Sequence, residues 1–460
     1  MSVTDPDVTI VRRAPGSLLQ ALIALLSQPM VYGVFIPGVT VVNALVGMTL
    51  PMLMTPTVFG EYALASTLFQ YGLIFDSGIS QLADRWIPPA LAQQRFEDAE
   101  ALGQRLMWVR IYIGGLVFAL ASTALLALAA EGQLPFGLWP GLLSALAGVL
   151  YMIALGPGII YRARSARRNY AFAIGTLGLG LAIARPAGLV AAGLTGSFLA
   201  LAAWYLAFVC LFHWRMPARL ALRPSASAAV SFVLQGLPFA ATAFGWAFYV
   251  TANRWFASRL MDPADFGHFA FSANIYSLLI GAIGGLSAFY YPRIVGRIAS
   301  EDRFALSRRI TSDFARLTAL VGAIMAVGIV LTPTLLAWVY PQYVHSASTA
   351  RVLLAGVPAM VIVSWLLPIS LSSGRRPWID GLLLYPAATA ILYFAIRLLV
   401  HHFGEVGVAA SSIVSALPLV AMLLFQLRHA HIVTTSAAIL LFGASLSVTI
   451  GLLGLVWVIL

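Results

Sequence analysis

The sequence predicts an all-α polytopic membrane protein: two parallel six-helix bundles with 12 core transmembrane helices, plus an extra C-terminal transmembrane helix. Three observations lead to this fold. The 460 residues are 61% hydrophobic and only 9% charged, with a mean hydropathy of +0.92, whereas soluble domains are about 25% charged. Long apolar segments recur along the whole chain. One short segment is repeated 207 positions later.

The apolar segments are long enough to cross a bilayer, which takes about 20 residues of helix. We expect thirteen spans, near residues 30–54, 58–82, 107–129, 138–160, 170–191, 195–212, 231–258, 265–290, 313–333, 352–371, 379–399, 406–427 and 437–459.

The span pattern divides the chain into four parts. Residues 1–29 read as a cytoplasmic, interfacial amphipathic lead-in rather than a cleaved signal peptide. The N-terminal six-helix bundle is expected over 30–225 and the C-terminal six-helix bundle over 226–430. Residues 431–460 hold the extra helix.

The basic residues orient the spans. All 27 are arginine, and the formal net charge is +11. With a cytoplasmic N-terminus, 22 of the 27 fall in cytoplasmic segments or at the helix ends beside them, as positive residues do in polytopic proteins; the others are Arg185, Arg254, Arg259, Arg351 and Arg397. Topology therefore explains the charge, and we predict no nucleic-acid partner. The one cysteine, Cys210, excludes an intrachain disulfide, and no metal-ligand spacing surrounds it.

The repeated segment lies at the outer turns between spans 1 and 2 and between spans 7 and 8. "MTPTVFGEYAL" at 54–64 matches "MDPADFGHFAF" at 261–271 at the Met, Pro, Phe, Gly and Ala positions. A repeat of six spans preserves orientation, so it predicts two parallel halves related by an axis along the membrane normal. Transporters built in this way bind substrate between the halves.

Span 7 has a polar face. Gln235, Thr242, Trp246, Tyr249 and Asn253 follow one another in steps of seven, four, three and four residues, which keeps them on one side of a helix. This face predicts either a helix–helix interface held by polar side chains or the wall of a water-filled cavity.

The charged residue at the end of that face is Arg254. An arginine in the hydrocarbon region costs roughly 2.5–3.5 kcal/mol, which favours a functional role, although snorkelling near the outer surface would lower this cost. Arg185 precedes Pro186, which would loosen the local helix. An anion contact and a snorkelling side chain remain alternatives for both arginines.

Other polar residues at membrane depth complete the predicted site. Asn43 lies in span 1 and Asn274 in span 8, while Gln70 lies above Asp76 in span 2. A carboxylate at this depth is a candidate for proton coupling; the alternatives for Asp76 are an ion pair with Arg85 and a cap on the inner helix end.

Two of these stretches resemble a known family. "FGEYALASTLFQYGLIFDSGISQLADR" is similar to the second-span signature of Wzx-type polysaccharide flippases: a G-x-Y turn, an apolar helix, D-x-G and a basic residue, here Gly60, Tyr62, Asp76, Gly78 and Arg85. The second half is similar in its polar-basic pair, Asn253-Arg254, and its later G-x-[YF] turn. It departs from the family in having Asn253 where aspartate is more common, and in the thirteenth span.

The resemblance implies the multidrug/oligosaccharidyl-lipid/polysaccharide exporter superfamily, whose members move amphiphiles by alternating access. The chain would then be a flippase, not an enzyme. It would carry a polyprenyl-diphosphate-linked oligosaccharide across the bacterial inner membrane for surface polysaccharide, exopolysaccharide or O-antigen synthesis. It would need no cofactor. Its partners would be membrane lipid and a polysaccharide polymerase or co-polymerase.

The physical chemistry of the predicted residues fits this substrate. Guanidinium groups bind phosphate in a bidentate manner, so Arg254 and Arg185 are expected to contact the diphosphate. Trp246, Tyr249, Asn253 and Asn274 would line a wet cavity for the sugars. The competing interpretations are a small-molecule or drug exporter of the same superfamily, a membrane glycan polymerase or related enzyme, and a non-transporting assembly scaffold. A drug exporter would need embedded acids, which are few here.

Overall fold

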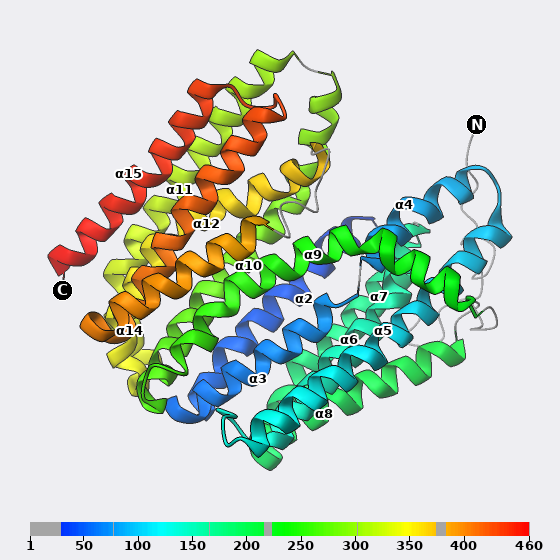
Figure 1. The fold of residues 1–460 in the computed structure, drawn as a ribbon, viewed down its shortest axis with the longest axis horizontal. Helices are drawn as coiled ribbons and strands as arrows, with labels where there is room; N and C mark the ends of the chain where they lie inside the picture. Colours follow the sequence, from blue (N-terminus) through cyan, green and yellow to red (C-terminus); the bar gives the residue numbers. More distant parts are fainter. Residues whose placement is uncertain are drawn as a thin grey trace. The chain divides into compact units, whose positions relative to one another are not determined.

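The computed structural model is helical throughout the residues it describes, which are 29–76, 78–164, 166–215, 223–300, 302–373 and 383–459 (Figure 1). Apart from Pro29, the predicted lead-in lies outside them, as do the first residues of the span predicted at 379–399. In chain order the main elements are α2 (Pro29–Thr49), η2 (Leu50–Leu53), α3 (Pro56–Ile74), α4 (Ile79–Ala92), α5 (Phe96–Ala130), α6 (Leu138–Ala163), α7 (Arg167–Leu179), η3 (Gly180–Ala184), α8 (Arg185–Arg215), α9 (Ala226–Ala257), α10 (Pro263–Ser300), α11 (Arg303–Val339), η4 (Pro341–Ser346), α12 (Ala347–Ser373), α14 (Tyr385–His429) and α15 (Thr435–Ile459).

Among the described residues, eight helical segments are long and apolar enough to cross a membrane, so the chain is a multi-pass membrane protein. Some of these segments contain two of the predicted spans. Residues 385–399 of one predicted span and the whole span predicted at 406–427 lie in α14, which turns back at Gly404 (φ 54°). In α8 the turn comes at Ala192 and Gly193 (φ 61°). Glycine adopts this left-handed backbone without steric cost, so each connection is very short.

The span predicted at 58–82 is wrong at its inner end. α3 stops at Ile74, and a separate helix, α4, begins at Ile79. Gly78 between them has φ 73°. α4 is amphipathic: it buries Leu82 and Ile87 and exposes Arg85, so composition alone cannot separate it from the apolar helix before it.

The chain forms two compact units. Unit 1 contains α2 and residues Leu68–Ala240. Its central helix is α6, which packs against α4, α5, α7 and α8. Buried side chains of α4, α5 and α6, among them Ile87, Leu106 and Ile160, form an apolar core. This packing positions α4, which follows Asp76, and α8, which begins at Arg185.

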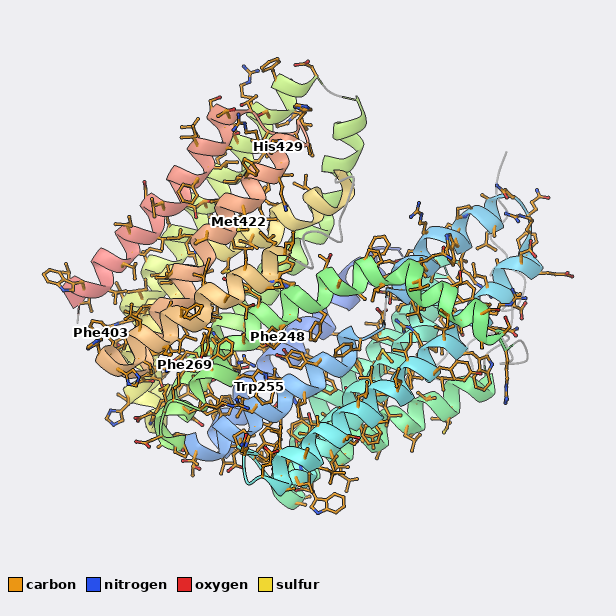
Figure 2. All side chains as sticks on the ribbon, in the orientation of Figure 1. Phe248, Trp255, Phe269, Phe403, Met422 and His429 are labelled. Carbon is orange, nitrogen blue, oxygen red and sulfur yellow. The ribbon has the colours of Figure 1, made fainter. Side chains whose placement is uncertain are left out.

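Unit 2 contains Leu50–Thr67 and Ala241–Leu460. Its central helix is α12, which packs against α10, α11, α14 and α15. Large apolar side chains of this unit are exposed, among them Phe403 on α14 (62% exposed; Figure 2). Trp457 on α15 is 81% exposed. These exposed side chains suit contact with lipid tails.

The extra C-terminal helix is part of unit 2. α15 is one of the segments long and apolar enough to span, and it packs against α11 and α12. One stripe of the helix is buried: Ala437, Leu441, Ser445, Thr449, Leu452 and Val456.

The two units do not coincide with the two sequence halves. Residues 50–67, from the first half, belong to unit 2, and the first fifteen residues of α9, from the second half, belong to unit 1. The bundle limits 30–225 and 226–430 therefore stay a prediction.

Candidate functional site

The nine predicted site residues fall into two groups. Unit 1 holds Asn43, Gln70, Asp76 and Arg185, and unit 2 holds Trp246, Tyr249, Asn253, Arg254 and Asn274. Each group is described within its own unit.

Arg185 lies at a wide helical turn. The backbone N–H of Arg185 donates to the carbonyl of Gly180, so the preceding segment, η3, is a π-turn between α7 and α8. Pro186 has no N–H and crowds the turn before it, and a π-turn accommodates that disturbance. Such turns are common at functional sites. The loosening expected from Pro186 is thus present, and it sets the position of Arg185.

The guanidinium of Arg185 lies over α2. Nη2 is 3.7 Å from the place where a Cβ on Gly47 would be. Asn43 lies one turn earlier on the same face of α2, because residues four apart are neighbours on a helix. Its Oδ1 is buried and accepts no hydrogen bond from the described residues. The structure therefore brings Arg185 and Asn43 to the same helix interface.

Three aromatic residues that we did not predict adjoin this interface. Tyr205 is fully buried, and its ring centroid lies 4.8 Å from that of Tyr151 and 6.3 Å from that of Phe69. The hydroxyl of Tyr205 has no hydrogen-bond partner among the described residues. A phenylalanine at position 205 would pack equally well, so the extra hydroxyl of the tyrosine is the sequence feature that could have indicated a polar role. Gln70, half-buried, follows Phe69 on α3.

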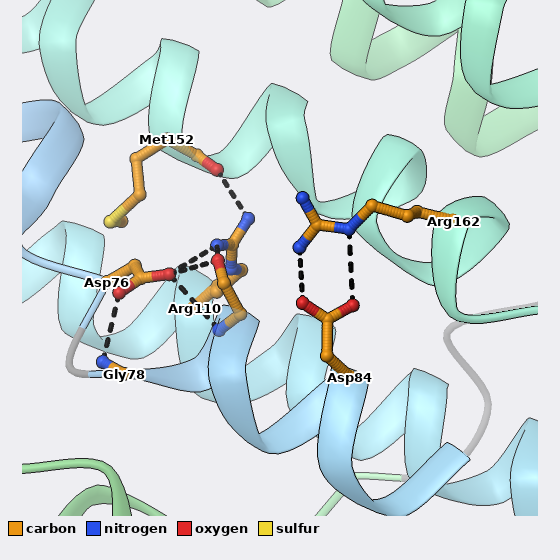
Figure 3. Close-up of polar contacts among 7 residues, drawn as sticks. Asp76, Gly78, Asp84, Arg110, Met152 and Arg162 are labelled. Carbon is orange, nitrogen blue, oxygen red and sulfur yellow. Dashed lines mark hydrogen bonds and ion pairs between the residues drawn. The ribbon is translucent and has the colours of Figure 1, made fainter. Parts of the chain in front are cut away.

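Asp76 is the centre of a polar network at the break between α3 and α4 (Figure 3). Its carboxylate accepts hydrogen bonds from the backbone N–H groups of Gly78 (2.9 Å) and Ser80 (3.1 Å) and from the Ser80 hydroxyl. It also pairs with Arg110, whose Nη2 is 2.7 Å from Oδ2.

Arg110 rather than Arg85 is therefore the ion-pair partner of Asp76. Arg110 is 3% exposed, and its Nη1 donates to the Met152 carbonyl on α6 at 2.9 Å. Arg85 is exposed. The sequence places Arg110 only among the cytoplasmic arginines, which gives no signal for this pairing. The Asp76 carboxylate accepts from the Ser80 N–H in the first turn of α4, so it serves the start of α4 rather than the inner end of α3. The coupling role of Asp76 stays a prediction.

The break between α3 and α4 requires glycine at position 78, and this can be tested. A Cβ there would lie 2.3 Å from the Gly236 carbonyl, and φ is 73°. Left-handed backbone costs an L-residue about 1–2 kcal/mol, and overpacking costs about 1–3 kcal/mol. We expect Gly78→Ala to destabilise the protein by about 2–4 kcal/mol, measured by thermal unfolding in detergent. The control is Gly115→Ala on α5, where a Cβ meets no atom within 4 Å; equal melting temperatures for the two variants would refute this account.

In unit 2, Arg254 lies near the end of the apolar helix α9. It is 3% exposed. Its Nη2 donates to the Ser277 hydroxyl at 3.0 Å and to the Ala273 carbonyl at 3.5 Å. Asn274, half-buried, lies one position after Ala273 on α10. Neutral oxygens of α10 thus hold a buried guanidinium.

The polar face of α9 packs against α14. The hydroxyls of Tyr249 and Ser415 are 3.1 Å apart, and Asn253 Nδ2 donates to the Ser412 hydroxyl at 3.2 Å. The rings of Trp246 and Tyr385 meet edge to face, with their centroids 6.0 Å apart. These are the contacts expected of a helix interface. Oδ1 of Asn253 is buried and accepts no hydrogen bond from the described residues.

A metal centre is not evident: within the described ranges, no three histidine, cysteine, aspartate or glutamate side chains could hold a metal ion together.

No family model matches the chain, and no curated protein matches it. Solved structures do. The lipid II flippase MurJ in an inward closed conformation aligns with a TM-score of 0.60 at 11% identity, covering 92% of both chains. The eukaryotic MATE transporter AtDTX14 aligns at 0.58 and 14% identity, covering 93% of this chain and 97% of that one.

A multidrug resistance MATE family transporter of the MOP superfamily, in an inward-facing conformation, aligns with a TM-score of 0.56 at 14% identity. The match covers 89% of this chain and 98% of the transporter. At such identities the comparison concerns the fold. The chain has a helical, multi-span fold similar to that of these transporters and of MurJ.

Proposed function

We propose that the chain is a flippase that moves a polyprenyl-diphosphate-linked oligosaccharide across the bacterial inner membrane, by alternating access of two six-helix bundles, with its N-terminus in the cytoplasm. Its product would serve surface polysaccharide or exopolysaccharide synthesis. The MOP fold supports transport as the activity, and the solved lipid II flippase with the same fold makes a lipid-linked substrate plausible.

The observation that carries the proposal is the placement of Arg254. A guanidinium that is 3% exposed in an apolar helix is costly in a membrane, by roughly 2.5–3.5 kcal/mol on insertion scales. Its contacts include the Ser277 hydroxyl and the Ala273 carbonyl. An anionic ligand that reached it would gain charge-assisted hydrogen bonds, which are about twice as strong as neutral ones.

The polar atoms beside the two arginines suit the rest of such a ligand. Asn253 lies one helical turn after Tyr249 and directly precedes Arg254. Asn43 lies at the helix interface that contains Arg185. In both asparagines the amide oxygen is buried and accepts no hydrogen bond from the described residues. A buried polar atom left unsatisfied costs about 1–3 kcal/mol. Sugar hydroxyls could donate to these oxygens.

The second candidate is a small-molecule exporter of the same superfamily. The similarity to MATE transporters, with TM-scores of 0.56 and 0.58, favours it. A cationic drug would require an available carboxylate. Asp76, the membrane-depth acid in our site, is already paired with Arg110, so we place this candidate second.

The test uses Arg254→Ala and Arg185→Ala in the native host. We expect each variant to reduce surface polysaccharide at least tenfold at normal protein levels, because loss of a hydrogen bond to a charged group costs about 1.5–3 kcal/mol. Polysaccharide output would be measured by quantitative sugar analysis of the cell surface. Full output from both variants would refute the assignment of the arginines.

A further inference from the structure

The short helix η4, between α11 and α12, is hydrogen-bonded to the turn at residues 51–54, which follows α2. Nε2 of Gln342 donates to the carbonyls of Pro51 (2.7 Å) and Met54 (2.9 Å), and the Tyr343 hydroxyl donates to the Met54 carbonyl at 3.1 Å. All four residues belong to unit 2, although Pro51 and Met54 come from the first sequence half. Three side-chain hydrogen bonds thus converge on two carbonyls.

The other side of η4 is fixed to α10. The Tyr343 ring, which is fully buried, stacks on Phe271 with centroids 4.3 Å apart and planes at 17°. The Ser272 hydroxyl donates to the Ser346 carbonyl at 3.2 Å, and His268 Nδ1 is 3.1 Å from the Ser346 hydroxyl. η4 therefore contacts both copies of the repeat. On the first half it makes the hydrogen bonds to Pro51 and Met54, and the Tyr343 ring also packs edge-on against Phe59, with centroids 5.9 Å apart.

The two copies of the repeated turn meet each other directly. A Cβ on Gly60 would lie 2.9 Å from the Phe266 ring and 3.3 Å from Gly267 Cα; a Cβ on Gly267 would lie 1.9 Å from the Pro56 carbonyl. The matching glycines of the repeat permit this close approach of backbones. Equivalent surfaces of the two sequence halves therefore pack together at this turn.

We infer that η4 is a latch: Gln342 and Tyr343 hold the first-half turn at 51–54 against the second half and must release it when the transporter changes state. The inference rests on the proposed alternating-access function. The bonds suit a releasable contact because they are neutral, and each contributes only about 0.5–1.5 kcal/mol net. Water can replace them at the acceptor carbonyls once the turn separates. The contact between the two glycines is close-packed.

The latch can be tested without any substrate. In a Cys210→Ser background, which removes the one native thiol, Met54→Cys places a thiol at a position 4% exposed in the native protein. The rate of its reaction with a maleimide in detergent reports how often the turn separates. Adding Gln342→Met, which keeps the side-chain length and removes two donated bonds, should raise that rate about 5- to 100-fold. Tyr343→Phe, which keeps the ring stack, should raise it severalfold.

The control is Thr318→Val, which removes a buried hydroxyl bonded within its own helix, to the Phe314 carbonyl, and should leave the rate unchanged. Ala63→Cys, also 4% exposed, is a second probe should Met54→Cys impair folding. Equal labelling with and without Gln342 and Tyr343, or rapid labelling in the parent, would overturn the latch. Because labelling requires no lipid-linked substrate, a failure of the proposed function would leave this result readable.

Discussion

Arg110→Met is expected to destabilise the protein by about 3–5 kcal/mol, because it leaves the Asp76 carboxylate buried without its cationic partner. The pair is largely shielded from solvent, with side chains 3% and 14% exposed. The substitution also removes the hydrogen bonds that Arg110 donates to the Ser80 hydroxyl and the Met152 carbonyl. Thermal unfolding of the purified protein in detergent measures the effect.

Two variants separate the buried charge from other consequences. Arg162→Met breaks the pair with Asp84, whose side chains are 44% and 41% exposed, and should cost less than about 1 kcal/mol. Asp76→Asn combined with Arg110→Met removes both charges and should recover part of the loss. If Arg162→Met were as costly as Arg110→Met, or if the double variant were less stable than the sum of the single ones, the ion-pair explanation would fail.

Arg254→Lys is expected to lower transport at least tenfold, although it keeps the positive charge. The lysine ammonium cannot form the bidentate fork that matches a phosphate group. Arg254→Gln, which removes the charge, should reduce transport by about 10- to 150-fold. The rates would be measured in the same cells that test the alanine variants, at matched protein levels.

The control for this series is Arg397→Gln. Arg397 is exposed on α14, and its Nη1 lies 3.5 Å from the Tyr393 hydroxyl, so it serves neither of the two candidate sites. Transport by this variant should stay within about twofold of the native rate. If Arg397→Gln lowered transport as much as Arg254→Gln, transport would depend on the total positive charge in the membrane region and not on the position of Arg254.

The helical, multi-span character could be predicted from the sequence, since apolar length alone determines which segments can cross a bilayer. The ends of the helices could not. The break at Gly78 and the turn at Gly404 each depend on a single residue with positive φ, and a backbone angle is not visible in hydropathy. The amphipathic helix α4 was therefore attached to the apolar helix before it.

The site could be predicted only in its components. Arg254 and Arg185 are visible because charge in an apolar span is rare. The partners are not: Arg110 and Asp76 lie 34 positions apart on different helices, and Asn253 and Ser412 lie 159 apart. Such pairings arise from helix packing, and a single sequence contains no record of it. The same is true of Gln342, an ordinary polar residue in a loop until its contacts with Pro51 and Met54 are known.

The most direct test of the account reconstitutes the purified protein in liposomes that contain a fluorescent polyprenyl-diphosphate-linked oligosaccharide and follows its appearance on the opposite leaflet with a membrane-impermeant quencher. We predict translocation by the native chain and by Arg397→Gln, and a loss of at least tenfold with Arg254→Gln. No translocation of the lipid-linked glycan by a folded native protein that exports a cationic drug from the same liposomes would contradict the account.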